Sequence, residues 1–435
     1  MLPLLIPITA LLSGVALLLL GTGLLNTLLA LRGAQEGYSD SLMGLIMAGY
    51  FVGFFIGTFL ALPLIRRMGH IRAFAFCAAL VACSVLLHAL VVNPWAWGLC
   101  RVLTGTALVI LYTAIESWLN AQTPGERRGQ VFAVYMVVNL IALAGAQQFL
   151  QFGSADQFPL YAIAAILVCL SLLPVTWTRV RQPEVQNVQR MPLSELYAAA
   201  PVALAGALLS GLAMGAFWGM GAFYASRSGL DVSGVATFMT CAILGGAVLQ
   251  YPLGRYSDRI DRRKVLGGVA AAAVLAALLM AALSGTVSGL LVSVALYGGL
   301  AFCIYPLTVA HLVDHLPSDK ILPGSSALLL VHGVGAATGP AAAGWLMDHT
   351  GTQALPVWFA MMQGLLALAA FISLRSKARD DAEHPGTFVP MVRTTPTVLE
   401  MMPDDELAPA DGAMVNGGGA TSEAQGSDKG QRRAG

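Results

Sequence analysis

Residues 254–264, GRYSDRIDRRK, and residues 62–72, LPLIRRMGHIR, are two related stretches, and their relation decides the fold. Both stretches are rich in basic side chains, in a chain that is 57% apolar and only 11% charged. Each follows a long apolar run, and an offset of 192 residues aligns position 62 with position 254. This spacing predicts a chain built from two related halves, each carrying the same short basic loop.

Long apolar runs continue on both sides of these two loops. The mean hydropathy of the chain is +0.73, which excludes an ordinary soluble globular protein. A membrane core about 30 Å thick needs roughly 20 apolar residues per helix. Twelve runs meet this length, at residues 5–31, 41–65, 73–93, 95–119, 130–152, 158–178, 199–225, 234–254, 265–284, 288–313, 325–347 and 354–374. The sequence therefore predicts an all-α integral membrane protein with twelve transmembrane helices in two pseudo-symmetric six-helix bundles.

The basic residues between these runs lie almost entirely on one side of the membrane. If the first helix runs outward, the inner loops hold 14 Lys and Arg residues, and the outer loops hold only Arg32 and Arg227. The inner set is Arg66, Arg67, Arg72, Arg127, Arg128, Arg179, Arg181, Arg190, Arg255, Arg259, Arg262, Arg263, Lys264 and Lys320. By the positive-inside rule, we expect both termini to be cytoplasmic.

Composition also divides the chain into segments. We expect residues 1–190 to form the first bundle with a central cytoplasmic loop, and residues 191–375 to form the second bundle. Residues 376–435 carry 6 basic and 10 acidic residues and no long apolar run. Such a segment cannot bury enough apolar surface to fold, so we predict a disordered cytoplasmic tail.

Glycines recur at every fourth residue in two of the runs. They are Gly49, Gly53 and Gly57 in the second run, and Gly211, Gly215 and Gly219 in the seventh. Residues four apart lie on one face of a helix, and a face without side chains lets a neighbouring backbone approach closely. We therefore expect tight helix packing along both stripes.

The repeated loop resembles the signature of the major facilitator superfamily, in which Gly-x-x-x-Asp-Arg-x-Gly-Arg-Arg/Lys-Arg/Lys follows helices two and eight. The second copy keeps Gly254, Asp258, Arg259, Arg262 and Arg263, and has Asp261 at the usual glycine. The first copy keeps Arg67, Gly69 and Arg72, and has Leu62 and Arg66 at the usual Gly and Asp. The resemblance covers about residues 1–375 and extends to the YcaD-like branch of the superfamily.

This resemblance implies a secondary transporter, multi-pass in the bacterial inner (plasma) membrane, that moves a small organic solute by alternating access. Protons are a candidate coupling ion, because the chain has no Gly-x-x-x-x-Gly-Lys-Ser/Thr motif for nucleotide-driven transport. We expect no cofactor, no metal site, no nucleic-acid partner and a monomer. Two other classes stay open, a non-transporting receptor and a membrane-embedded metal-dependent enzyme centred on His311, Asp314 and His315.

The resemblance also assigns gating roles to loop residues. In the family, the loop Asp caps the first turn of a helix from the other half, which here pairs Asp258 with the region of Gly129 and Gln130. A carboxylate at a helix N-terminus stabilises that end of the helix. Glu116 matches an acidic position that pairs with loop arginines, here Arg67 or Arg72. The alternative is a solvated loop that only sets topology.

Arg101 is the only permanently charged residue deep inside a predicted span, where a buried cation is costly unless it is paired or faces water. We expect it to face a solute cavity or, alternatively, a structural partner. In the family, helices one, four, seven and ten line the cavity, and His332 lies in the eleventh helix. The predicted cavity residues are Asn26, Arg101, Tyr112, Ser210, Tyr224, Tyr297, Tyr305 and His332.

Each of these side chains can equally serve helix packing. Arg101 and the lack of a carboxylate in the expected cavity favour anionic or neutral polar solutes over organic cations. Glu116 and His332 are the titratable groups available for proton coupling.

Overall fold

The computed structural model describes residues 2–124, 127–177 and 191–375. Within these residues the chain is helical and contains no strand. The predicted loop arginines Arg179, Arg181 and Arg190, and the predicted tail at 376–435, lie outside the described residues.

In the described part of the chain, twelve helices are long and apolar enough to cross a membrane. They are α1 (Leu2–Gln35), α2 (Asp40–Met68), α3 (His70–Leu90), α4 (Pro94–Gln122), α5 (Arg128–Gln148) continued by η2 (Phe149–Phe152), α6 (Phe158–Leu170) continued by α7 (Leu172–Trp177), α9 (Pro201–Arg227), α10 (Val232–Ser257), α11 (Arg262–Ala282), α12 (Val287–Val313), α13 (Ile321–Thr350) and α14 (Ala354–Arg375). The short helices α8 (Leu193–Ala199) and η3 (Ser318–Lys320) lie between spans. Each span matches a predicted run to within about one helical turn. The predicted all-α membrane fold is confirmed.

Polar side chains fix where several of these spans begin. At the start of α4, Asn93 Oδ1 accepts a hydrogen bond from the Trp95 N–H at 3.0 Å. At the start of α10, Asp231 Oδ1 accepts one from the Gly234 N–H at 2.8 Å. These bonds satisfy N–H groups that have no partner within the helix. The apolar runs therefore become helices with defined starts.

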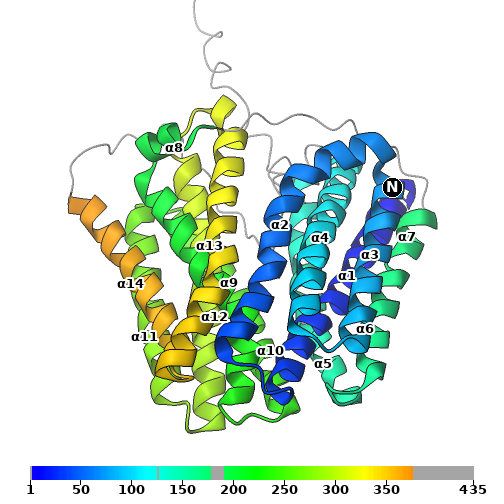
Figure 1. Ribbon diagram of the computed structural model, residues 1–435. Helices are drawn as coiled ribbons and strands as arrows, with labels where there is room; N and C mark the ends of the chain where they lie inside the picture. Colours follow the sequence, from blue (N-terminus) through cyan, green and yellow to red (C-terminus); the bar gives the residue numbers. More distant parts are fainter. Residues whose placement is uncertain (1, 125–126, 178–190, 376–435) are drawn as a thin grey trace, which may run out of the picture.

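The spans form two bundles that stand side by side in Figure 1, with α1 to α7 in the first and α9 to α14 in the second. The bundles meet mainly where α2 packs against α13, α5 against α10 and α1 against α9. The end of the molecule that carries the loops at 66–72 and 258–264 is called the motif face below. The other end, where α1 leads into α2 and α9 leads into α10, is called the opposite face.

Within each bundle, glycine stripes bring helices into backbone contact, as their spacing predicts. A Cβ atom at Gly53 of α2 would lie 2.0 Å from the Val102 carbonyl oxygen of α4. A Cβ atom at Gly215 of α9 would lie 2.3 Å from the Ala336 carbonyl oxygen of α13. Real atoms do not approach this closely, so a side chain at either position would push the helices apart.

Between the bundles, glycines make a similar contact at the opposite face. A Cβ atom at Gly44 of α2 would lie 2.4 Å from the Pro340 carbonyl oxygen of α13. A Cβ atom at Gly344 of α13 would lie 2.5 Å from the Asp40 carbonyl oxygen of α2. The two bundles thus touch backbone to backbone at this end.

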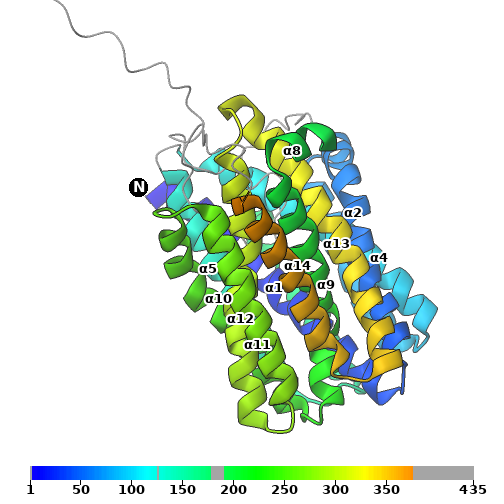
Figure 2. The ribbon, with the colours of Figure 1, turned by 90° about the vertical axis from the view of Figure 1, so that its left-hand side faces the viewer.

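Polar contacts join the bundles at the same end. They are Ser41 with Asp348 (2.6 Å from Oγ to Oδ2), Arg227 with Asp40 (3.5 Å) and Gln148 with Thr240 (3.2 Å from Nε2 to Oγ1). Together with the glycine contacts, they close the opposite face. Figure 2 shows α2, α13, α9 and α14 in a view turned by 90°, with α8 at the motif face.

Candidate functional site

A cavity lies between the two bundles in the half of the molecule nearer the motif face. It holds about 1110 Å³ of space free of protein atoms, part of it open to the surroundings. One wall comes from α2, and the others come from α9, α12 and α13. The lining residues are Tyr50, Phe51, Phe54, Phe55, Thr58, Met214, Gly215, Trp218, Ala301, Phe302, Tyr305, Ser326, Leu329, Leu330, His332, Gly333 and Ala336.

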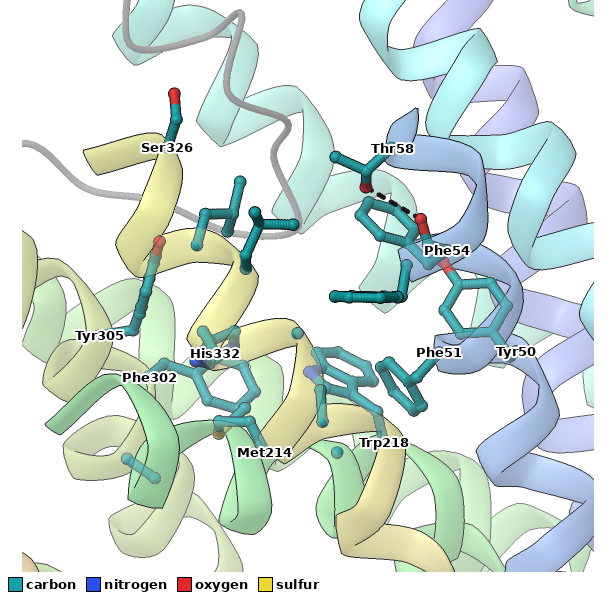
Figure 3. A pocket seen from close by; sticks show the side chains of 17 residues that line it. Tyr50, Phe51, Phe54, Thr58, Met214, Trp218, Phe302, Tyr305, Ser326 and His332 are labelled. Carbon is teal, nitrogen blue, oxygen red and sulfur yellow. Dashed lines mark hydrogen bonds between the residues drawn. The ribbon is translucent and has the colours of Figure 1, made fainter. Parts of the chain in front are cut away.

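Aromatic rings dominate two sides of this cavity, as Figure 3 shows. On one side, α2 presents a group that includes Tyr50 and Phe54, whose ring centroids lie 6.2 Å apart. On the other side, Trp218 of α9 packs against Phe302 of α12 with centroids 5.6 Å apart. Among the described residues that line the cavity, none is Asp, Glu, Lys or Arg. The cavity is therefore an uncharged aromatic chamber.

His332 supplies the polar centre of the chamber. Its Nδ1 lies 3.2 Å from the Ala207 carbonyl oxygen and 3.2 Å from the Ser210 hydroxyl, both on α9. Its ring lies 4.3 Å from the Tyr305 ring of α12. Because a carbonyl oxygen only accepts hydrogen bonds, the neutral ring that donates from Nδ1 to Ala207 keeps Nε2 as an acceptor. Two predicted cavity residues, Tyr305 and His332, thus line the cavity. A third, Ser210, contacts the His332 ring from α9.

Arg101 lies one layer behind the cavity wall and is 2% exposed. One of its terminal nitrogens donates to Asn26 Oδ1 at 2.9 Å. Its guanidinium carbon lies 4.7 Å from the centroid of the Tyr50 ring, so the two side chains make a cation–π contact. Asn26 in turn donates from Nδ2 to the Trp218 carbonyl oxygen at 2.7 Å. A chain of contacts therefore runs from the buried cation across the bundle boundary to two residues of the cavity wall.

The other predicted cavity residues lie inside the bundles. Tyr112 is buried with its ring 6.4 Å from that of Phe54. Tyr297 stacks on Phe359 with centroids 4.7 Å apart, and Tyr224 donates to Gln353 Oε1 at 3.3 Å. These contacts are packing and bracing contacts within one bundle, and none of the three residues lines the cavity.

Sequence reasoning missed the aromatic wall of α2. The signal was present as the run YFVGFF at residues 50–55, which places four rings beside Gly53. The glycine spacing predicts only the packing face of this helix, and the four rings lie on its remaining surface. Trp218 and Phe302 were missed for the same reason, since apolar rings in a transmembrane run look like ordinary core.

The two copies of the loop motif are built differently. In the first, Gly69 ends α2 and begins α3 with a φ of 79°, a left-handed conformation that favours glycine. Its N–H donates to the Ile65 carbonyl oxygen at 2.7 Å. Arg67 and Arg72 on either side are exposed. The glycine of the motif is therefore required by backbone geometry in this copy.

In the second copy, Asp261 replaces that glycine and caps α11 with a φ of −44°. Its carboxylate accepts from the Arg263 N–H at 2.9 Å and from the Arg263 guanidinium at 2.9 Å. Burial disfavours the ionised carboxylate, but the bonds from Arg263 outweigh it and hold the pKa of Asp261 below its usual value. The N-cap carboxylate thus replaces the glycine turn.

Arg262 is the buried hub of the second copy. It pairs with Asp314 at the end of α12 at 2.6 Å and with Asp258 at 3.1 Å. It also donates to the Ser257 hydroxyl at 3.3 Å. Gly254 is buried one turn earlier, whereas Arg259 is exposed. The motif residues therefore tie the α10–α11 loop to α12 of the same bundle.

Glu116 lies inside the first bundle with no exposed surface. Its carboxylate accepts a hydrogen bond from the Tyr135 hydroxyl of α5 at 3.0 Å. This places the acid of α4 at a junction with α5 and away from the residues that line the cavity.

The histidine cluster considered for a metal is arranged as a packing group. The rings of His311 and His315 lie 4.5 Å apart, and His315 Nδ1 lies 2.8 Å from the His311 carbonyl oxygen. Asp314 between them is engaged by Arg262. Over the residues that the structure describes, no group of three or more His, Cys, Asp or Glu side chains has a metal-binding arrangement.

The sequence matches a known protein family over most of its length. A family profile described as "Major Facilitator Superfamily" matches residues 11–320 and 203–398. The chain is 26% identical over 382 residues to an uncharacterized MFS-type transporter of Enterobacter sp. (strain 638), which covers 87% of this chain and 97% of that protein. It is 25% identical over 381 residues to the uncharacterized MFS-type transporter YcaD of Escherichia coli (strain K12 / DH10B), with coverage of 87% and 97%.

Solved structures share the same fold. The nucleoside transporter NupG superposes with a TM-score of 0.69 at 17% identity, covering 85% of this chain and 100% of that one. A bacterial homolog of the human lysosomal transporter Spinster gives a TM-score of 0.67 at 15% identity, covering 87% and 98%. The Escherichia coli fucose:proton symporter FucP (N162A) gives 0.54 at 18% identity, covering 85% and 98%. At these identities the similarity concerns the fold alone.

Proposed function

Because this chain belongs to the major facilitator superfamily of secondary transporters, we propose that it moves a small organic solute across the membrane by alternating access. The predicted YcaD-like resemblance is confirmed by its relatives. The chain is therefore a membrane transporter and not an enzyme. One chain forms the whole cavity, which supports a monomer as the working unit.

The unequal closure of the two ends is the observation that carries this proposal. At the opposite face, Gly44 and Gly344 bring α2 and α13 into backbone contact, and Ser41 bonds Asp348 across the same boundary. Toward the motif face, the same two helices instead line the cavity, through residues such as Phe54 and Leu329. Alternating access requires two states, each closed at one end of the molecule. A structure that is closed at the opposite face and has its cavity toward the motif face corresponds to one of them.

We propose that the motif face is cytoplasmic, so that this state opens inward. The support is the distribution of charge, because Arg66, Arg67 and Arg72 lie at the motif face, whereas Arg32 and Arg227, in the last turns of α1 and α9, are the only Lys or Arg residues near the opposite face in the described part of the chain. Both termini are then cytoplasmic. The membrane is the inner membrane of a bacterium.

Cysteine cross-linking tests the alternation directly. In a background without the six native cysteines, Ser41→Cys with Asp348→Cys places two thiols where a 2.6 Å hydrogen bond now joins the bundles. We expect an oxidant to lock the opposite face shut. Two further cysteines serve as reporters: Met47→Cys, on α2 between the cross-link and the cavity, and Ser326→Cys, in the cavity lining. Each is labelled with a membrane-impermeant maleimide from either side of the membrane.

Without the cross-link, Met47→Cys should react from the outer side and Ser326→Cys from the cytoplasmic side. With the cross-link, labelling at Met47→Cys should stop and labelling at Ser326→Cys should continue. A non-transporting receptor with one fixed conformation would leave Met47→Cys unlabelled in both cases. Labelling of Ser326→Cys only from the outer side would reverse the proposed topology.

We also propose that coupling to protons, if the solute moves uphill, runs through His332. The support is position, since His332 lines the cavity and Glu116 lies inside the first bundle with Tyr135. The groups that face His332 are Ser210 and Tyr305. In proteoliposomes containing a pH-sensitive dye, solute addition should alkalinise or acidify the lumen with the native chain and fail to do so with His332→Gln. An unchanged response with His332→Gln would transfer the role to Glu116 or another group.

The Asp258 latch remains a proposal for the other half of the cycle. When the motif face closes, Asp258 would cap α5 near Gly129 and Gln130, as in the family. Its support is that Asp258 stands at the C-terminal end of α10, the helix that packs against α5. In the present state its carboxylate pairs with Arg262.

A further inference from the structure

The proposed transport cycle leaves the nature of the solute open, and the cavity lining bears on it. We propose that the cavity binds an uncharged, planar aromatic solute that carries one hydrogen-bond donor, held flat between the α2 rings and the Trp218–Phe302 pair with its donor on His332. This inference rests on the proposed function only in taking the cavity as the solute site.

The first step is the shape of the walls. In Figure 3, Phe54 of α2 stands across an open space from Phe302 of α12, which packs against Trp218. The walls belong to different bundles, so they can close on a flat molecule from both sides. Aromatic rings favour stacked or tilted contact with another ring. A planar solute therefore gains contact on two faces, which a bulky saturated one of the same volume does not.

The second step is charge. Among the described residues, those lining the cavity are uncharged, so an ionised solute would lose its hydration with no opposite charge to replace it. Aromatic walls can hold cations, but Tyr50 already carries the Arg101 guanidinium on its ring at 4.7 Å. A second cation against the same wall would meet that positive charge. The lining therefore selects against cations most strongly and favours neutral molecules.

The third step is the polar anchor. Nδ1 of His332 is held by the Ala207 carbonyl at 3.2 Å, which leaves Nε2 as an acceptor in the neutral ring. Ser210 and Tyr305 hold the ring from two sides, on α9 and α12. A solute O–H or N–H is the complement of this nitrogen. A site that hydrogen-bonds a solute donor rejects the analogue that lacks it.

The test uses matched probes on the purified full chain in detergent. The probes are 2-naphthol, its methyl ether, its saturated analogue decahydro-2-naphthol, 2-naphthoate and 2-naphthylmethylammonium. Binding is measured by calorimetry and by the rise in unfolding temperature, since a ligand that binds only the folded state stabilises it. We expect 2-naphthol to bind at least tenfold tighter than each of the other four, with the cation weakest.

Variants locate the site. Trp218→Leu and Phe54→Leu should each weaken 2-naphthol at least tenfold. His332→Leu should erase the preference for 2-naphthol over its methyl ether while leaving binding of the ether unchanged. Phe76→Leu, at a lipid-facing ring of α3 that is 54% exposed, is the matched control and should bind as the native chain does. Unfolding temperatures without ligand verify that each variant is folded.

Equal binding of all five probes, tighter binding of a charged probe, or equal losses in Phe76→Leu and Trp218→Leu would overturn the proposal. Binding is measured here without any transport. A negative result therefore rejects this solute class and leaves the cross-linking test of alternation standing, whereas failure of that test leaves the binding result standing.

Discussion

Helix α2 meets two neighbours through glycines, and the two contacts differ in what they must do. Toward α4, Gly53 packs within the first bundle, where a Cβ would lie 2.0 Å from Val102 O. Toward α13, Gly44 packs between the bundles, where a Cβ would lie 2.4 Å from Pro340 O. The chemistry is the same, but in alternating access only the second contact has to break. Local packing therefore does not distinguish a permanent contact from a temporary one, whereas the identity of the partner helix does.

The largest expected effect is at the permanent contact. Gly53→Val forces a branched side chain against backbone atoms that cannot rotate away, which should cost about 3 kcal/mol of folding stability. We expect a clear fall in the unfolding temperature of the purified protein. Gly268→Val in α11, where a Cβ would meet nothing within 4 Å, is the control and should stay close to native. A similar fall in both would show that valine acts through the helix itself.

The next effect is at the temporary contact. Gly44→Ala should penalise only the state with the opposite face closed, by about 2 kcal/mol, or about 30-fold in the conformational equilibrium. Maleimide labelling of Met47→Cys from the outer side should rise accordingly, with little change in unfolding temperature. Gly98→Ala, at a glycine with nothing within 4 Å, is the matched control. If Gly44→Ala lowers stability as Gly53→Val does, the contrast between the two faces of α2 fails.

Asn26 extends the same comparison to hydrogen bonds. Asn26→Asp keeps an acceptor for Arg101 but removes the donor to the Trp218 carbonyl across the bundle boundary. Loss of this bond should weaken the closed opposite face by about 1 kcal/mol. Thr27→Val removes a bond of the same length, 2.7 Å, to Gln147 within the first bundle. We expect Asn26→Asp to raise Met47→Cys labelling and Thr27→Val to leave it unchanged; the reverse pattern would contradict the boundary role.

The smallest expected effect is at the motif face. Asp258→Ala should remove a helix-capping interaction from the state with the motif face closed, worth about 0.3 to 1 kcal/mol, or up to about fivefold. Distances between spin labels at Thr58→Cys and Ser326→Cys, across the cavity, should shift toward the open population. Lys264→Ala, an exposed residue of the same loop, is the control. An unchanged distribution with Asp258→Ala would remove the latch.

Part of the candidate site was accessible from single residues. Tyr305 and His332 were predicted for the cavity and line it. Tyr112 and Tyr297 are at comparable depth on the same kinds of helix, yet they face into their own bundles. The residues differ in the direction in which they point from the helix axis, because each step along a helix turns the side chain by about 100°. In a transmembrane run, all faces of the helix carry apolar residues. No periodic pattern in these runs marks which face meets water.

Arg101 illustrates the same limit. Its cost in the membrane core predicts that it faces either a solute cavity or a structural partner, and the structure joins it to Asn26 and to the ring of Tyr50 behind the cavity wall. Its place one layer behind the wall depends on α1 and α2 lying against α4, which no local feature of α4 specifies.

The sequence by itself determined the twelve spans, the duplication and the glycine stripes, because hydrocarbon thickness and backbone contact act on runs of residues within one segment. Only the tertiary structure decided which face of each helix looks into the cavity, that aromatic rings line it, and which end of the molecule is closed. These features arise where segments far apart in the chain meet, as Gly44 meets Pro340 and Asn26 meets Trp218. The free energy of such a contact depends on two helices and on how they lie against each other. It therefore cannot be inferred from the residues of either helix alone.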